Sequence, residues 1–182
     1  QRQILHDTES IGQPKVRSGQ ATLARLNPDI RVEALQMRLE GEALDDQVAR
    51  ADVVLDCCDN FATRHAVNRA CVRHKKPLVS GAAIRFDAQV AVFDLRHDDS
   101  PCYACLFPEE GEVTEERCAV MGVFAPLTGM IGTLQAAEAL KLLTGAGQTL
   151  AGKLVIFDAL KSDWRSVRLA RDSGCSVCNA GE

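Results

Sequence analysis

The sequence predicts an α/β fold, a sheet with flanking helices. Short apolar runs, typical of strands covered on both faces, alternate along the chain with longer segments of helical character. The chain has 182 residues, of which 46% are hydrophobic and 25% charged. This length suits one domain, and the composition excludes collagen-like, low-complexity and disordered classes.

The first predicted elements are two helices with an extended segment between them. Apolar residues at helical spacing predict a helix over residues 14–27, which ends at the Asn27-Pro28 pair. Residues 30–35 alternate and are expected to be strand-like. Residues 42–50 are expected to form a short helix.

The following elements continue the alternation of strand and helix. Residues 51–56 form an apolar run that predicts a buried strand, and Asn60 is placed to cap the next helix, which runs to about His74. The remaining expectations are strands at residues 77–80, 89–95, 154–158 and 166–169, and a helix over residues 123–143, interrupted near Pro126 and closed by Gly145.

Charge and hydropathy exclude two classes of partner. The net charge is −4, and affinity for nucleic acids comes mainly from clustered cations, so we expect no nucleic-acid partner. The most apolar long stretch, residues 123–143, contains Gln135, Glu138 and Lys141. Because a membrane span needs about 18 or more apolar residues, we expect that stretch to be a core helix and expect no membrane partner.

Eight cysteines are present, and four of them form two Cys-x2-Cys pairs. The pairs are Cys102 with Cys105 and Cys175 with Cys178. Two such pairs can supply the four thiolates of a structural Zn²⁺ site, which leaves no open position for catalysis. A zinc site is favoured over disulfides in a reducing cytoplasm, and a redox Cys-x2-Cys motif is the main alternative.

Two carboxylates follow the predicted strand at residues 51–56. Ligands of open α/β sheets bind at the carboxyl ends of strands, so Asp56 and Asp59 lie where chemistry is expected. A carboxylate at such a place can hold Mg²⁺ against nucleotide phosphates. The alternative is that Asp59 or Asn60 only caps the next helix.

An acidic segment, residues 108–117, precedes an unpaired cysteine. The segment contains five glutamates and is expected to be a mobile surface loop, either simply solvated or a flap over a site. Cys118 is either a reactive thiolate beside Arg117 or a small buried hydrophobic residue. Cys57, Cys58 and Cys71 fit a structural role.

Eight segments in a fixed order carry a family resemblance. They are Gln1-Arg2-Gln3-Ile4-Leu5, Gly12-Gln13-Pro14-Lys15, Asn27-Pro28, Leu55-Asp56-Cys57-Cys58-Asp59-Asn60, Ser80-Gly81-Ala82-Ala83, Cys102-Tyr103-Ala104-Cys105, residues 129–141 and Gly174-Cys175-Ser176-Val177-Cys178. Together they resemble the ThiF/MoeB/HesA family, bacterial adenylyltransferases related to ubiquitin-activating enzymes, over essentially the whole chain.

The resemblance implies an enzyme that adenylylates a ubiquitin-like sulfur-carrier protein. The Gly-Gly carboxylate of the carrier attacks the α-phosphate of ATP, pyrophosphate leaves, and the acyl-adenylate then accepts sulfur for thiamine or molybdopterin biosynthesis. By position, Arg2 and Lys15 match ligands of the ATP phosphates and Asp59 matches the Mg²⁺ ligand, and Asn60 beside it is a further expected cofactor-binding residue. The four paired cysteines match zinc ligands. Cys118 matches a loop cysteine that some members link to the carrier or to sulfur.

The resemblance also implies an organisation and a setting. We expect a Rossmann-like mixed sheet, the C-terminal part of a ThiF-type fold, in a single domain over residues 1–182. The family's Gly-rich nucleotide loop has no counterpart in these residues, so we expect the enzyme to be a longer protein. A cytoplasmic homodimer, with a sulfurtransferase or cysteine desulfurase as a further partner, is expected. The alternatives are a non-catalytic carrier-docking module and a zinc-thiolate redox or nucleic-acid module.

Overall fold

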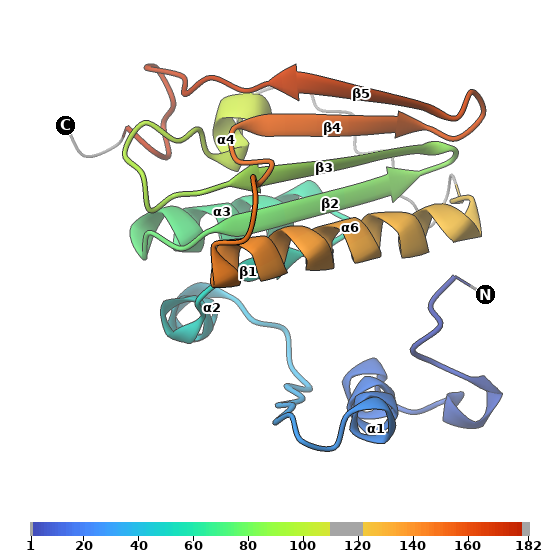
Figure 1. Cartoon of the computed structure of the whole chain (residues 1–182). Coiled ribbons are helices and arrows are strands. Elements are labelled where there is room, and N and C mark those ends of the chain that lie inside the picture. The colour runs from blue at the N-terminus through green and yellow to red at the C-terminus, as the bar shows by residue number, and fades with distance from the viewer. Residues whose placement is uncertain (1, 110–121, 180–182) are drawn as a thin grey trace. The chain divides into compact units, whose positions relative to one another are not determined.

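The structure, a computed structural model, describes residues 2–109 and 122–179. It divides into two compact units, Gln1–Leu39 and Glu40–Glu182 (Figure 1). Each unit is described by itself. A single domain over residues 1–182 stays a prediction.

The first unit is built around one helix, α1 (Lys15–Leu26), which follows a short 3-10 turn, η1 (Thr8–Ser10). The helix ends where the sequence predicts, at Asn27 before proline. The preceding segment packs on α1: the Thr22 hydroxyl donates to the Leu5 carbonyl at 2.9 Å, and His6 Nδ1 lies 2.8 Å from Ser18 Oγ.

The strand-like prediction for residues 30–35 is wrong. These residues form no ladder, because the described part of this unit contains no other strand to pair with. The Val32 carbonyl instead accepts a hydrogen bond from the side chain of Gln20 in α1, at 2.7 Å. The alternation of apolar and polar residues here is therefore a property of an extended segment that is not part of a sheet.

The second unit contains a five-stranded mixed sheet in the order β1-β2-β3-β4-β5. Its strands are β1 (Val54–Asp56), β2 (Leu78–Ile84), β3 (Asp87–Phe93), β4 (Lys153–Asp158) and β5 (Asp163–Arg168). Of the neighbouring strands, only β1 and β2 pair in parallel, and the other three pairs are antiparallel. The β1–β2 pairing brings Asp56 opposite Ser80. The mixed α/β sheet is thus confirmed. Strand β2 extends beyond the predicted Ser80, because β3 pairs with it as far as Ile84.

Four described helices accompany the sheet: α2 (Gly41–Arg50), α3 (Phe61–Arg73), α4 (Tyr103–Leu106) and α6 (Ala125–Thr144). The Asn60 side chain accepts the Thr63 N–H at 2.8 Å, which confirms the predicted cap of α3. Gly145 closes α6 with a left-handed φ of 70°. The predicted interruption near Pro126 is wrong. Pro126 lies in the first turn of α6, where backbone N–H groups have no partner within the helix, so the N–H that proline lacks is not missed.

Helices cover both faces of the sheet (Figure 1). On one face, α3 and α4 pack against residues such as Leu78 and Phe93. On the other, α6 packs against alternate residues such as Val79 and Val90. The carboxyl end of β1 and the facing part of β2 therefore lie between α3 and α6. Among the described residues, no helix combines the length and the apolar character that crossing a bilayer requires.

Candidate functional site

A buried ion pair organises the carboxyl end of β1 and the part of β2 that lies opposite it. Asp56, at the end of β1, is 2% exposed, and Arg64 of α3 donates to its Oδ2 at 2.7 Å. The same guanidinium donates to Ser80 Oγ at 3.0 Å, to the Gly81 carbonyl at 3.0 Å and to the Cys58 carbonyl. Arg64 thus ties α3 to the end of β1, to the middle of β2 and to the turn that follows β1.

The two carboxylates of this turn have different surroundings. Asp56 also accepts the Cys58 N–H at 2.9 Å and the Ser80 hydroxyl at 2.8 Å, so its oxygens are occupied within the protein. Asp59 is exposed, and its Oδ1 accepts a hydrogen bond from the Asn60 side chain at 3.3 Å. Asp56 is therefore a structural residue. Asp59 is the carboxylate that is available to bind a ligand.

The donor chemistry at Asp59 fits Mg²⁺. Mg²⁺ prefers carboxylate oxygens, usually one or two from the protein, and keeps several waters or phosphate oxygens in its shell. An exposed carboxylate at a strand end provides one such oxygen and leaves room for those other ligands. The Asn60 side chain, which both caps α3 and donates to Asp59, fixes the carboxylate beside the helix start.

Gln135 of α6 holds the end of β1 and the facing part of β2 from the other face of the sheet. Its side-chain Nε2 donates to the Asp56 carbonyl at 2.9 Å and to the Val79 carbonyl at 3.1 Å, and the residue is 3% exposed. A Cβ at Gly81 would lie 2.3 Å from Gln135 Oε1. Glycine at position 81 is thus required by the close approach of this side chain.

Gly81→Ala is expected to destabilise the protein by about 1 to 3 kcal/mol, the usual cost of overpacking. Gln135 cannot move aside without losing its bonds to two backbone carbonyls. Denaturant unfolding measures the change. In the double variant with Gln135→Ala the clash is absent, so the added cost of Gly81→Ala should largely vanish. An equal cost in both backgrounds would contradict the contact.

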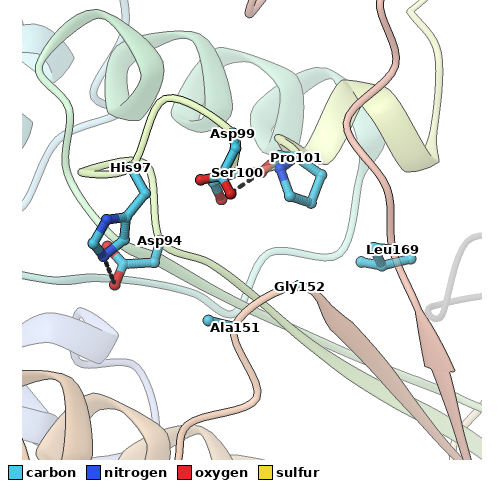
Figure 2. Close-up of a pocket in the computed structure, with 8 residues that line it drawn as sticks. All are labelled: Asp94, His97, Asp99, Ser100, Pro101, Ala151, Gly152 and Leu169. Atoms are coloured by element: carbon cyan, nitrogen blue, oxygen red, sulfur yellow. Dashed lines mark hydrogen bonds and ion pairs between the residues drawn. The ribbon is translucent and has the colours of Figure 1, made fainter.

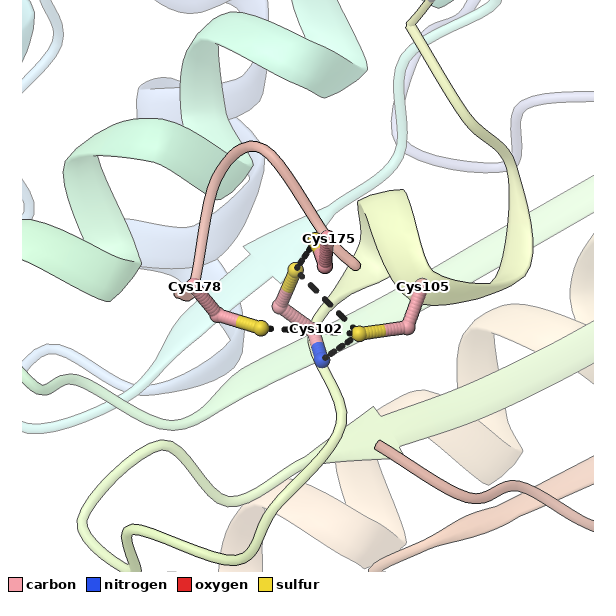
Figure 3. A group of neighbouring side chains, drawn as sticks. All are labelled: Cys102, Cys105, Cys175 and Cys178. Carbon is pink, nitrogen blue, oxygen red and sulfur yellow. Dashed lines mark hydrogen bonds between the residues drawn. The ribbon is translucent and has the colours of Figure 1, made fainter. Parts of the chain in front are cut away.

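The four paired cysteines come together in one cluster. Their Sγ atoms all lie within 4.8 Å of one another, with one pair at the start of α4 and the other in the C-terminal turn (Figure 3). The sulfurs of Cys102 and Cys175 are 3.7 Å apart, those of Cys105 and Cys178 3.5 Å, and those of Cys102 and Cys105 3.9 Å. Four sulfurs about 2.3 Å from a tetrahedral Zn²⁺ lie about 3.8 Å from one another. The donor set and its spacing therefore fit zinc.

Protein N–H groups surround the sulfurs. The Cys105 sulfur accepts the backbone N–H groups of Cys102 at 3.4 Å and Asp172 at 3.5 Å. Burial would raise the pKa of Cys175, but backbone N–H groups of the C-terminal turn lower it overall. Burial raises the pKa of Cys178 to about 11. Because zinc binds thiolates, metal binding must release protons, and zinc affinity is expected to fall as the pH falls.

The other described cysteines are structural, as the sequence indicated for them. Burial raises the pKa of Cys58 to about 12, with the Asp56 charge adding to the effect, and burial also raises the pKa of Cys71 to about 12. Both thiols are therefore protonated at neutral pH and poor nucleophiles. Cys57 is exposed, and its sulfur donates to Gln135 Oε1 at 3.6 Å.

The remaining predicted site residues are distributed over the chain. Arg2 and Lys15 belong to the first unit, where both are exposed and Lys15 is the first residue of α1. Asp59 and Asn60 belong to the second unit. That Arg2, Lys15 and Asp59 surround one triphosphate stays a prediction. Cys118 and most of the acidic segment 108–117 lie outside the described residues.

A surface cavity of about 400 Å³ lies at the opposite edge of the sheet from Asp59. It is formed by the loop that follows β3 and the turn that precedes β4 (Figure 2). Its most buried acid, Asp94, accepts two hydrogen bonds from Arg96, both at 2.7 Å, and this contact lowers the pKa of Asp94. The carboxylate is therefore already neutralised within the protein, and the cavity does not extend the site at Asp59.

Four buried polar residues were not singled out as site residues from the sequence. They are Arg64, Asn68, Ser80 and Gln135. A signal existed for two of them, because Asn60, Arg64 and Asn68 recur every four residues and so share one face of α3. The partners of these side chains come from distant segments, which no local pattern reveals.

Comparison with known proteins finds relatives that match this chain over nearly its full length. The ThiF family profile matches residues 1–177. The chain is 52% identical over 178 residues to the sulfur carrier protein ThiS adenylyltransferase of Escherichia coli K12, covering 98% of this chain and 70% of that protein. It is 46% identical over 178 residues to the molybdopterin-synthase adenylyltransferase of Salmonella typhimurium, covering 98% of this chain and 71% of that protein.

A solved structure shares the fold. The crystal structure of E. coli MccB with ATP superposes with a TM-score of 0.79 at 22% identity. The match covers 97% of this chain, and the chain spans 54% of the MccB chain. The family match over residues 1–177, together with the high identity to two curated relatives, shows that the chain belongs to the ThiF family.

Proposed function

We propose that the full-length protein adenylylates the C-terminal Gly-Gly carboxylate of a ubiquitin-like sulfur carrier of the ThiS or MoaD type. The observation that carries the proposal is the 52% identity to a ThiS adenylyltransferase over 98% of the chain. The exposed Asp59, held at the carboxyl end of β1, supports it, because that is where α/β sheets bind their ligands.

The proposed chemistry needs positioned charge rather than a general base. The carrier carboxylate is ionised at neutral pH, since the ordinary pKa of a terminal carboxyl is about 3.5. It attacks the α-phosphorus of ATP, the bond to the β-phosphate oxygen breaks, and pyrophosphate leaves. In this proposal Arg2 and Lys15 neutralise phosphate charge, and Asp59 holds the Mg²⁺ that screens the phosphates. Cys118 is proposed as a later carrier or sulfur attachment point.

The proposal includes partners and a setting. Sulfur is delivered after adenylylation, so a sulfurtransferase or cysteine desulfurase is a proposed partner. A related mouse protein bears the name adenylyltransferase and sulfurtransferase MOCS3. We further propose a homodimer and a reducing, cytoplasmic setting, in which the clustered thiols stay available for zinc.

Asp59→Asn is expected to reduce ATP–pyrophosphate exchange at least about 100-fold, in line with the loss of an electrostatic group at a reacting centre. Asparagine keeps the size of the side chain but removes the charge that Mg²⁺ requires. The assay uses the full-length protein, Mg²⁺ and a carrier ending in Gly-Gly. Metal analysis should show unchanged zinc, because Asp59 is not one of the four clustered ligands.

Asp52→Asn is the matched control. Asp52 is also exposed, and it precedes β1 at the opposite end of the strand from Asp59. It should retain full exchange. Exchange that persists in Asp59→Asn would refute the role of that carboxylate. The docking-module alternative predicts a different result. The unmodified protein would then show no exchange with either a ThiS-type or a MoaD-type carrier, and its binding of the carrier would not depend on ATP.

A further inference from the structure

Asn68 is a fully buried amide in the middle of α3. Its exposed fraction is 0%, and its neighbours along the helix, Val67 and Ala70, belong to the apolar core. A buried carboxamide is costly unless its donor and acceptor groups are both satisfied. The side chain therefore needs partners within the protein, and both of them lie in the four-cysteine cluster or directly beside it.

The orientation of the amide is fixed by a backbone donor. The Tyr103 N–H donates to Asn68 Oδ1 at 2.9 Å, so the atom facing it must be the oxygen. The Nδ2 group consequently points at the sulfur of Cys102, to which it donates at 3.6 Å. One side chain thus holds the backbone at the start of α4 and also contacts a candidate metal ligand.

The contact matters because of the charge of a zinc–tetrathiolate centre. Four thiolates around Zn²⁺ carry a net charge of 2 − 4 = −2, and N–H donors to the sulfurs stabilise that charge. Cys102 and Asn68 are both 0% exposed, so the donor to this sulfur must come from the protein. Cys105 receives its N–H groups from the backbone. Cys102 accepts the backbone N–H of Cys105 and, in addition, the side-chain N–H of Asn68, which mutation can remove.

We propose that Asn68 is a positioning residue of the metal centre, which orients Cys102 toward the ion and stabilises its thiolate. The neighbouring turns of the helix explain why this position is rigid. Arg64, four residues earlier on the same face, is fixed to Asp56 at the end of β1 and to Ser80 within β2. Helix α3 therefore joins the cysteine cluster to the carboxyl end of β1 and to β2. This inference does not depend on the proposed function.

Asn68→Asp tests the donor separately from the acceptor. Aspartate keeps an oxygen for the Tyr103 N–H, removes the N–H that faces Cys102 and adds a negative charge there. Zinc affinity, measured by competition with a chromogenic chelator, is expected to fall about 10- to 100-fold. In Co²⁺-substituted protein, the sulfur-to-cobalt absorption bands should shift. Asn68→Leu, which is uncharged and of similar size, should also weaken zinc binding.

Asn179→Asp is the matched control, next to Cys178 of the same cluster. Asn179 donates through its side chain to the Asp172 carbonyl at 2.7 Å and accepts from Arg171, so the substitution adds the same charge without removing a donor to sulfur. It should leave zinc affinity and the cobalt spectrum unchanged. If Asn68 only fixes the start of α4, Asn68→Asp will bind zinc as tightly as the unmodified protein, and that result overturns the proposal. Equal losses in Asn68→Asp and Asn179→Asp would also overturn it.

Discussion

Cys175→Ser is expected to release the metal and to lower the melting temperature by roughly 8 to 16 °C. A ligand present at 1,000 times its dissociation constant contributes about 4 kcal/mol of stability. A domain of this size loses about 2 to 4 °C per kcal/mol. Serine keeps the volume of the buried Cys175 side chain but cannot supply a thiolate. Metal analysis after dialysis and thermal unfolding of the full-length protein measure the two effects.

The physical reason for so large an effect is the separation of the two cysteine pairs in the sequence. The metal would join α4 to a turn about 70 residues later, so its loss frees the end of the described chain from the core. Cys57→Ser is the control, because Cys57 is exposed and lies outside the cluster. It should keep both zinc and melting temperature. Disulfides in place of zinc in the unmodified protein would support the redox alternative.

Arg64→Met is expected to lower the free energy of unfolding by about 3 to 5 kcal/mol, the usual cost of breaking a buried ion pair by removing one partner. Methionine fills much of the volume but leaves the 2%-exposed carboxylate of Asp56 without its cation. Two carbonyls, of Cys58 and Gly81, also lose their donor. Denaturant unfolding of the purified variant measures the loss.

Arg69→Met separates burial from ion pairing. Arg69 lies on the same helix and contacts Glu109 at 2.6 Å, about the length of the Arg64–Asp56 contact, but its side chain is 45% exposed. Exposed pairs contribute about 0 to 1 kcal/mol, so this variant should lose no more than that. Similar losses in the two variants would show that burial does not decide the strength of the Arg64 contact.

Local patterns were sufficient for most helices and strands. The cap at Asn60 and the closing glycine of α6 each act within a few residues, and the structure confirms both. The apolar run at residues 51–56 does contain a strand, but only over Val54–Asp56, and the prediction that it is buried is wrong, because β1 is at the edge of the sheet and Leu55 is exposed. Two further failures have a common cause. Residues 30–35 lack a neighbouring strand, and β2 is longer than predicted because of β3, so pairing between segments decided both outcomes.

The sequence by itself determined the mixed α/β class, the four candidate zinc ligands and the strand end that carries Asp59, because spacing and residue chemistry are local properties. Only the tertiary structure decided which of Asp56 and Asp59 is available to a ligand. It also revealed Arg64, Gln135 and Asn68 as the residues that hold β1, β2 and the cysteine cluster. Their roles depend on burial and on partners 6 to 79 positions away in the chain, and packing brings such partners into hydrogen-bond distance.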